Sequence, residues 1–318
     1  MGNKVTAVIV TYNRCAKLQK ALDIYMASKV SDIIVVNNAS TDGTDDFLRT
    51  LADPRIHLLS LPENSGGAGG FHEGMKYAHT TLNDYDWILV QDDDAYPDID
   101  ALNRFINSAE PRDMDAIISA VYYPEGGLCE MNRPGFLPFK DLKQSLATLR
   151  KGNSGFHIDS SYYLDKRSCS VDFASFVGLF ISKRIVEKMG FPDKDWFIYG
   201  DDLDYTTNFT RAGFQMIFDP KLVFYHDCQS LNAGNVNQKT YSSLWRAYFM
   251  YRNGVIIYKK LAGNLFFLVF LYKLLSWILA SKAYEDKMKY FKLLWVSIKD
   301  GLNGDRRKKI KDVNGIVG

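Results

Sequence analysis

The 318-residue sequence contains only four cysteines, and no two of them lie close together along the chain. Cys15, Cys129, Cys169 and Cys228 show neither the spacing of a zinc site nor that of a redox motif. This sparse use of cysteine is consistent with a reducing compartment.

The sequence also lacks a recognisable secretion signal, internal repeats and low-complexity segments. Its first residues, MGNKVTAVIVTYN, have neither the charged start nor the long apolar run and cleavage site of a signal peptide. Gly2 does not by itself predict myristoylation, because Thr6 falls within a predicted buried strand. Hydrophobic residues make up 47% and charged residues 24%, so a sizeable core is expected and extensive disorder is not.

The net charge of +2 hides an uneven distribution along the chain. From residue 259 to the end there are 13 Lys/Arg and 5 Asp/Glu, whereas residues 1–258 carry a net charge of −6. An acidic body with a basic tail predicts that the tail meets something anionic. The alternative is an ordinary solvated helix face.

Apolar runs alternate with helical patterns through the first part of the chain. The runs at residues 5–11, 32–36, 56–61, 87–90 and 114–121 are predicted strands. This alternation predicts an α/β fold with a mostly parallel sheet that is covered on both faces. Residues 122–170 are predicted to form an irregular insertion, residues 171–181 a strand, and residues 183–189 and 203–212 helices; the chain is predicted to be helical from residue 241.

Polar residues follow each of the first four predicted strands. They are residues 11–13, 37–42, 64–70 and 92–94. Because ligands bind beyond the carboxyl ends of parallel strands, these loops are expected to converge on one binding edge.

Three adjacent carboxylates, Asp92, Asp93 and Asp94, follow the apolar run at 87–90. They repel one another unless a cation or strong donors compensate. Mg²⁺ and Mn²⁺ commonly use one or two carboxylates together with substrate phosphates, so the triplet predicts a metal site. The alternative is a solvated acidic turn that caps a helix.

The glycine-rich segment NSGGAGGF at residues 64–71 is predicted to be a loop that precedes a helix. Glycines and a helix N-terminus together suit a phosphate group. The segment lacks the Lys and Ser/Thr of a P-loop, and it does not follow the first strand, as a dinucleotide-binding fingerprint would. The turn at residues 38–44, taken alone, is explained by helix capping.

The segment WFIYGDDLDY at residues 196–205 places three carboxylates at a predicted helix start. One of them could act as a general base for an acceptor hydroxyl, although acidic residues also simply stabilise helix N-termini. His226 ends another apolar run, and a structural and a functional role are both open for it.

In combination and in order, these motifs resemble the inverting glycosyltransferase family two, which has a GT-A type fold. The resemblance rests on VIVTYNR at 8–14, VVNNASTDGT at 35–44, the glycine segment, the Asp triplet and residues 199–205. It covers roughly residues 4–230. Within the family, the chain is most similar to bacterial galactofuranosyltransferases, with rhamnosyltransferases next.

The resemblance implies roles for individual residues. Asp202 matches the catalytic base, and Asp92, Asp94 and His226 match ligands of a Mn²⁺ or Mg²⁺ ion. The expected acceptor-binding residues are Asp201, Trp196 and Tyr199. The expected donor-binding residues are Thr11, Tyr12, Asn13, Arg14, Asn37, Asn38, Asn64, Gly66, Gly67, Gly69, Gly70, Asp92 and Asp93. Asn37 stands where the family usually has Asp, which leaves the choice between uracil and thymine open.

The expected reaction is transfer of galactofuranose from UDP-galactofuranose to a lipid-linked glycan acceptor in the synthesis of a cell-surface polysaccharide such as O-antigen. Transfer from dTDP-rhamnose is the alternative. An inactive sugar-binding module would be expected to have disrupted acidic motifs, and a nucleotidyltransferase would be expected to have basic residues near the glycine segment. No nucleic-acid partner is expected.

The resemblance and the change in composition together predict two parts. Residues 1–238 form a GT-A catalytic domain, with a nucleotide-binding half at about 1–121 and an acceptor half at about 122–238. Residues 239–318 form a helical region. Residues 265–280 carry one charge, Lys273, and as a helix would be about 24 Å long, short of the roughly 30 Å hydrocarbon core.

This helical region is therefore predicted to lie in a membrane interface rather than to cross the membrane. Tyr272, Trp277 and the flanking Lys259, Lys260 and Lys282 suit that position. Residues 284–299 form a second amphipathic segment, and the basic run at 306–309 would attract anionic lipid. The expected location is cytoplasmic, peripheral on the inner face of the cell membrane. The alternative is packing within the chain or against a second copy.

Overall fold

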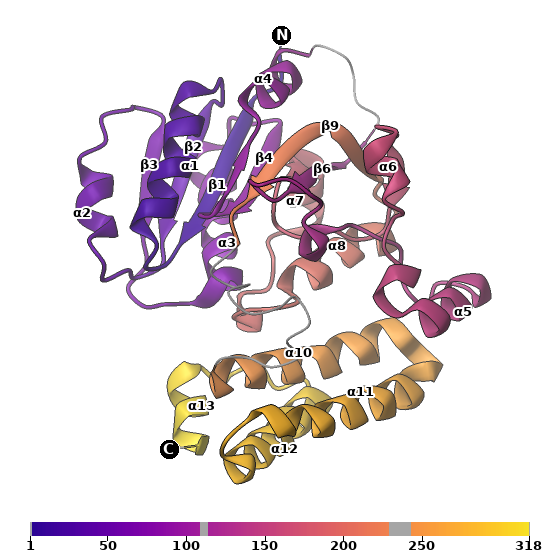
Figure 1. Cartoon of the computed structure of the whole chain (residues 1–318). Helices are drawn as coiled ribbons and strands as arrows, with labels where there is room; N and C mark the ends of the chain where they lie inside the picture. The colour runs from indigo at the N-terminus through magenta and orange to yellow at the C-terminus, as the bar shows by residue number, and fades with distance from the viewer. Residues whose placement is uncertain (1, 109–113, 229–242, 318) are drawn as a thin grey trace.

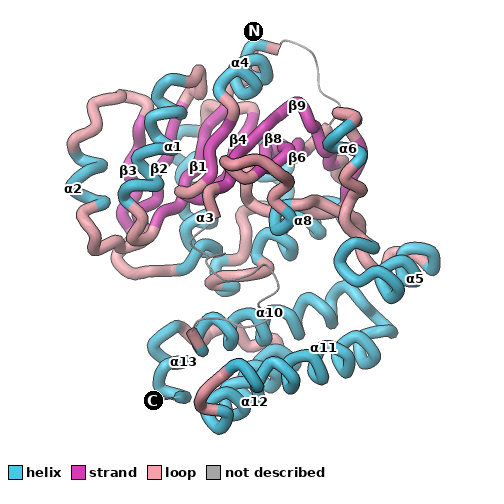
Figure 2. The backbone as a smooth tube through the Cα atoms, viewed as in Figure 1, coloured by secondary structure: helices cyan, strands magenta, loops and turns pink. Residues whose placement is uncertain are grey.

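The structure is a computed structural model, and it describes residues 2–108, 114–228 and 243–317 (Figures 1 and 2). A nine-stranded sheet forms the main body, with strand order β3-β2-β1-β4-β8-β6-β9-β5 and with β7 paired to β9. The last four labelled helices form a separate layer beneath the sheet domain (Figure 1).

The first part of the sheet is parallel and lies between helices. Its strands are β1 (Val5–Thr11), β2 (Asp32–Asn37), β3 (Ile56–Ser60) and β4 (Trp87–Asp92), and its helices are α1 (Cys15–Ala27), α2 (Thr44–Arg49), α3 (Gly66–Tyr77), a π-helical turn (Ala78–Leu82) and α4 (Ile99–Asn107). All seven residues of β1 are buried, because side chains on both of its faces enter hydrophobic clusters. This arrangement confirms the predicted α/β architecture.

The second part of the sheet is mixed rather than parallel. Its strands are β5 (Ala95–Pro97), β6 (Ala116–Tyr122), β7 (Cys169–Val171), β8 (Leu179–Ser182) and β9 (Met216–His226), and its helices are α5 (Leu142–Lys151), α6 (Ser161–Leu164), α7 (Lys183–Met189) and α8 (Asp201–Arg211). β8 runs antiparallel to both β4 and β6. The single strand predicted at 171–181 is wrong, since the chain there leaves β7 and enters the sheet again at β8.

The predicted loop at residues 64–70 is also wrong in part, because α3 already begins at Gly66. A Cβ atom on Gly70 would lie 2.4 Å from Val10, and one on Gly74 would lie 2.5 Å from Val8. These glycines let the helix pack directly on β1. The glycine-rich composition therefore reflects close helix–sheet packing as well as any contact with a ligand.

The C-terminal layer consists of α10 (Leu244–Ala262), α11 (Phe266–Ala280), α12 (Lys287–Asn303) and α13 (Ile310–Val317). Short 3₁₀ turns occur at Glu130–Asn132, Gly152–Gly155, Lys194–Trp196, Gly263–Leu265 and Ser281–Ala283. The stretch Leu244–Ala283 contains an 18-residue window with a mean hydropathy of 1.7, so by length and composition alone it could cross a membrane. However, the chain reverses at Gly263, which has φ +50°, and α11 returns alongside α10 (Figure 1). The predicted domain boundary at 238/239 lies outside the described residues.

Candidate active site

The Asp triplet lies where the carboxyl end of β4 turns toward β5. The Tyr25 hydroxyl donates to the Gln91 side chain, whose amide in turn donates to the Ala95 carbonyl at 2.6 Å, and both contacts are buried. β5 pairs with β9 so that Ala95 lies opposite His226. This pairing brings the end of β9 to the triplet, although more than 130 residues separate them in the sequence.

Asp92, Asp94 and His226 together offer two carboxylate oxygens and one ring nitrogen within 4.8 Å of one another. His226 Nε2 lies 3.1 Å from Asp94 Oδ1, and His226 Nδ1 lies 2.7 Å from Asn132 Oδ1. An amide oxygen can only accept, so the contact with Asn132 favours a proton on Nδ1. Nε2 faces the Asp94 carboxylate; burial lowers the pKa of His226, but the hydrogen bond and charge of Asp94 outweigh it and raise that pKa, so a metal ion binding at Nε2 would displace a proton from it. This donor set fits the Mn²⁺ or Mg²⁺ ion that the sequence motifs imply.

The electrostatics of the triplet favour a bound cation. Burial and the charge of Asp94 raise the pKa of Asp92 to about 7, and burial raises the pKa of Asp93 to about 6. For Asp94, burial is outweighed by the hydrogen bond and charge of His226 and by the charges of Arg14 and Lys17, so its pKa is lowered. A divalent ion would offset the repulsion between these carboxylates.

Two predicted donor-binding residues contact the triplet directly. The Thr11 hydroxyl donates to Asp93 at 2.7 Å, and Arg14 Nη1 lies 2.7 Å from Asp94 Oδ2. In the described structure both side chains therefore orient the carboxylates, and the positive charge of Arg14 partly offsets theirs. Lys17, which was not predicted, lies 3.8 Å from Asp94 and adds a second positive charge.

The nearby loop residues lie around an open surface pocket. The backbone N–H of Asn13 donates to Ser40, and its side chain accepts from Thr41 N–H, which joins the loops after β1 and β2. Tyr12 is 44% exposed. The pocket is lined by Asn13, Arg14, Cys15, Ala16, Lys17, Asp42 and Arg246. Its three basic side chains make it suitable for a diphosphate group.

Asn37, Asn38 and Asn64, which are predicted to bind the donor, make hydrogen bonds within the protein. Asn37 accepts from Ser40 N–H, and Asn38 accepts from Ser65 N–H while donating to the Gly66 carbonyl. Asn64 accepts from Gly66 N–H. These bonds hold the start of α3 against the loop that follows β2.

The four predicted glycines differ in what surrounds them. A Cβ on Gly66 would lie 2.0 Å from the Phe197 carbonyl, and one on Gly69 would meet Ser65. Gly70 packs on β1, as described above. Gly67 faces open space, since a Cβ there would meet nothing within 4 Å. Gly67 is therefore the position in this segment where a ligand could approach the backbone.

Asp201 and Asp202 form the first turn of α8, where the helix dipole favours negative charge. Burial and the charges of Asp202 and Asp92 raise the pKa of Asp201 well above its ordinary value, whereas burial raises the pKa of Asp202 to about 6. Asp202 Oδ1 accepts from Leu203 N–H at 2.7 Å. Asp204 is held by Lys260 of α10, so it is a poor candidate for a general base.

The loop before α8 has a strained backbone. Phe197 and Tyr199 have backbone φ angles of +66° and +69°, in a region that residues other than glycine rarely adopt. From α10, the Asn253 side-chain amide donates to the carbonyls of Trp196, Ile198 and Tyr199, at 3.1, 2.8 and 2.8 Å.

Arg252 of α10 supports the same loop, since it donates to the Trp196 carbonyl at 2.9 Å. The Trp196 side chain is 1% exposed and packs against Ala68 and Ile257. It supports the loop and offers no exposed surface to an acceptor in this structure, whereas Tyr199 is half-buried.

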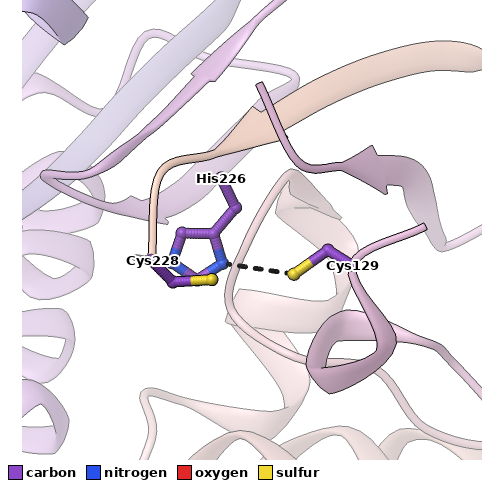
Figure 3. A group of neighbouring side chains, drawn as sticks. All are labelled: Cys129, His226 and Cys228. Carbon is purple, nitrogen blue, oxygen red and sulfur yellow. Dashed lines mark hydrogen bonds between the residues drawn. The ribbon is translucent and has the colours of Figure 1, made fainter. Parts of the chain in front are cut away.

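Sequence reasoning missed several residues that shape this site. Asn132 orients His226, Arg252 and Asn253 hold the loop before α8, and Cys129 and Cys228 lie beside the His226 ring (Figure 3). Cys228 lies only two residues from His226, but the two form no recognised metal spacing. The other residues are not marked by their local sequence, because each acts on a partner that is distant along the chain.

The sheet order, the acidic turn and the Asp pair at the start of α8 are those of a GT-A type glycosyltransferase. The sequence model of glycosyl transferase family 2 matches residues 6–169, and the chain belongs to this family. This result confirms the family and the glycosyltransferase activity inferred from the motifs.

Comparisons with individual proteins agree with this assignment. Galactofuranosyltransferase GlfT1 of Mycolicibacterium smegmatis is 26% identical and covers 78% of this chain and 81% of its own length. The dTDP-rhamnosyl transferase RfbF of Shigella flexneri is 23% identical and covers 96% of this chain and 97% of its own length. Among solved structures, S. aureus TarS 1–349 is similar with a TM-score of 0.55 and 13% identity, and it covers 99% of this chain and 83% of its own; this likeness shows the fold.

Proposed function

We propose that this glycosyltransferase transfers galactofuranose from UDP-galactofuranose to a glycan acceptor, with inversion at the anomeric carbon and with Mn²⁺ or Mg²⁺ as cofactor. The observation that carries the proposal is the convergence of Asp92, Asp94 and His226 on one edge of the sheet, where the charge of Asp92 reaches Asp201. The names of the GlfT1 relatives and the glycine-segment motif support the choice of sugar.

Asp92, Asp94 and His226 would hold the metal ion, which when bound neutralises the leaving diphosphate. Arg14, and Lys17 in the adjoining pocket, supply further positive charge near the same place. Asn132 accepts from Nδ1, so Nε2 would be the ring nitrogen that binds the ion.

Asp202 is the proposed general base. The acceptor hydroxyl attacks the anomeric carbon, the bond from that carbon to the diphosphate breaks, and the hydroxyl proton passes to the Asp202 carboxylate. A pKa of about 6 leaves Asp202 mainly ionised at neutral pH while keeping it a stronger base than an ordinary aspartate. Asp201 is proposed to bind acceptor hydroxyls.

Transfer of rhamnose from dTDP-rhamnose is the second candidate. It is favoured by the rhamnosyltransferase RfbF, which matches nearly the whole chain rather than four fifths of it. Asn37 does not distinguish UDP-galactofuranose from dTDP-rhamnose, because its side chain can present either its carbonyl oxygen or its NH₂ group to a nucleotide base. An inactive sugar-binding module is disfavoured, since every carboxylate of the acidic motifs is present.

The deciding experiment measures hydrolysis of UDP-galactofuranose, dTDP-rhamnose and other nucleotide sugars by the full chain, with Mn²⁺ and with excess chelator. We expect UDP-galactofuranose to be consumed fastest, only when metal is present, and far more slowly by Asp202→Asn. Preference for dTDP-rhamnose would replace the proposed donor. Full activity in excess chelator would overturn the proposed metal dependence.

We further propose that the acceptor is lipid-linked and that α11 and α12 dock on an anionic membrane surface from the cytoplasmic side. Leu268, Leu271, Leu275 and Leu279 are exposed at helical spacing on α11, as are Met288, Phe291 and Trp295 on α12. These two helices lie on the side of the helical layer away from the sheet (Figure 1). Exposed lysines at 282, 287, 289 and 292 border this apolar face, as suits an interfacial surface.

The basic run at 306–309 does not carry this proposal. Arg306 pairs with Asp193, Arg307 with Asp305, Lys308 with Asp300 and Lys309 with Glu63. Lys260, predicted to flank the membrane segment, is likewise held by Asp204 and Asn208. These cations tie the helical layer together and to the catalytic domain. A homo-oligomer formed through the same apolar face remains the rival to membrane docking.

A further inference from the structure

Two cysteines that are far apart in the sequence meet beside the proposed catalytic metal site. The sulfur atoms of Cys129 and Cys228 and a ring nitrogen of His226 all lie within 4.8 Å of one another (Figure 3). Cys129 follows β6, whereas His226 and Cys228 come from the end of β9. All three side chains are buried, with exposed fractions of 3% or less.

The two nitrogens of His226 face different chemical surroundings. Nε2 faces the Asp94 carboxylate, whereas Nδ1 lies 3.9 Å from Cys129 Sγ. Asn132 Oδ1 accepts from both Nδ1 and Cys129 Sγ, at 2.7 and 3.0 Å. The Asn132 amide nitrogen donates to Ser175, which fixes the orientation of the carbonyl oxygen. One edge of the ring therefore meets a carboxylate, and the other meets the Asn132 amide oxygen and sulfur.

We propose that Cys129, Cys228 and His226 Nδ1 form a second metal site, which binds a soft or borderline ion such as Zn²⁺. Two thiolates and an imidazole are a common zinc donor set, whereas Mg²⁺ and Mn²⁺ prefer oxygen. The Asn132 carbonyl oxygen is placed to complete the coordination. Burial of the whole group suits a closed site rather than an exposed one.

A metal ion bound at this thiol site prevents His226 from binding the ion proposed at Asp92 and Asp94, which we call the oxygen site. This consequence rests on the proposed function. Each thiol loses its proton to solvent when the ion binds. Nδ1 must present its lone pair, so it gives up its proton to solvent and the ring keeps only the Nε2 proton, which is donated to Asp94. A neutral imidazole cannot ligate through both nitrogens. Zn²⁺ bound at the thiol site therefore inhibits the enzyme, because it withdraws His226 from the proposed catalytic metal site.

The first test is titration of the reduced full chain with Cd²⁺, observed through the ultraviolet charge-transfer band of a metal thiolate. We expect one ion per chain in the wild type and in the control Cys15→Ser/Cys169→Ser, which changes the two cysteines outside the group. The band should be absent from Cys129→Ser/Cys228→Ser, and Zn²⁺ affinity should fall at least about tenfold in Cys228→Ser alone. No band in the wild type, or an equal band in the double variant, would overturn the site.

The second test measures Mn²⁺ release by electron paramagnetic resonance, which needs no turnover. Zn²⁺ should free Mn²⁺ from the wild type at concentrations that leave Mn²⁺ bound in Cys129→Ser. Retention of Mn²⁺ by a zinc-loaded wild type would overturn the exclusion. If the wild type binds no Mn²⁺ at all, the proposed oxygen site and the exclusion both fail, whereas the cadmium band still decides the thiol site.

Discussion

At the scale of single residues, Asp94 is the carboxylate most closely tied to the proposed metal site, since it contacts both Arg14 and His226. We expect Asp94→Ala to lose Mn²⁺ binding and donor turnover together, because one of three ligands is removed. Isothermal titration with Mn²⁺ and a donor-hydrolysis assay measure the two effects. The matched control is Asp84→Ala, which removes an exposed carboxylate paired with Lys4. Normal metal binding in Asp94→Ala would contradict the ligand assignment.

Asp202→Asn keeps the size of the side chain but removes its ability to take a proton. We expect turnover to fall by about 10²–10⁴-fold with little change in donor affinity, because the proton comes from the acceptor. Asp204→Asn serves as the control, since that carboxylate pairs with Lys260. If Asp202→Asn turns over normally and Asp201→Asn does not, the base is Asp201.

The raised pKa of Asp202 predicts a particular dependence of activity on pH. A general base must be deprotonated, so kcat/KM should be constant at high pH and should fall as pH drops through about 6, the pKa to which burial raises Asp202. The profile should be recorded at saturating metal, because Asp92 and Asp93 also have raised pKa values. In Asp202→Asn the remaining activity should lack this acidic limb. A limb that persists in the variant would assign the titration to another group.

At the scale of elements, α10 acts on the active site although it belongs to the C-terminal helical layer. Asn253 donates to three carbonyls of the loop that precedes α8. We expect Asn253→Ala to lower kcat by about 10- to 100-fold, because a small shift of a catalytic group is enough to cause such a loss. KM for the donor should change less, since the proposed donor-binding residues lie on other loops.

The matched control is Asn264→Ala, which changes an exposed asparagine in the turn between α10 and α11. Circular dichroism and thermal melting would show that both variants fold. A normal kcat in folded Asn253→Ala would show that the strained loop holds its shape without the Asn253 hydrogen bonds. The same contacts imply that truncation before α10 would damage catalysis as well as any membrane contact, so point variants are the better probes.

At the scale of the whole molecule, the exposed apolar face of α11 and α12 predicts binding to anionic liposomes. Leu268→Glu/Leu279→Glu should reduce flotation strongly, because it places two charges on the face proposed to enter the interface. The matched control is Leu164→Glu, which alters an exposed leucine of α6. Sedimentation analysis of the same proteins separates this result from oligomerisation. If the wild type stays at the bottom of the gradient with both anionic and neutral lipid, the face is instead a packing or oligomer surface.

The GT-A fold and the position of the acidic motifs could be predicted from the sequence. The local signals were strong, because β1 is a continuous buried run and the Asp triplet follows the buried apolar residues of β4. The beginning of α3 could not be predicted in the same way. Glycine is a poor helix former, and only the close approach of Val10 and Val8 explains why Gly70 and Gly74 lie in a helix.

By itself, the sequence determined the strand–helix alternation, the carboxylates at the ends of strands and the apolar character of residues 265–280, because each of these depends on neighbours along the chain. Tertiary structure alone decided which partners meet across the fold. It placed Asn132 on His226, Cys129 beside Cys228, and Asn253 beneath the loop before α8. It also paired the basic run at 306–309 with carboxylates, since charges in sequence do not reveal the groups that will neutralise them in space.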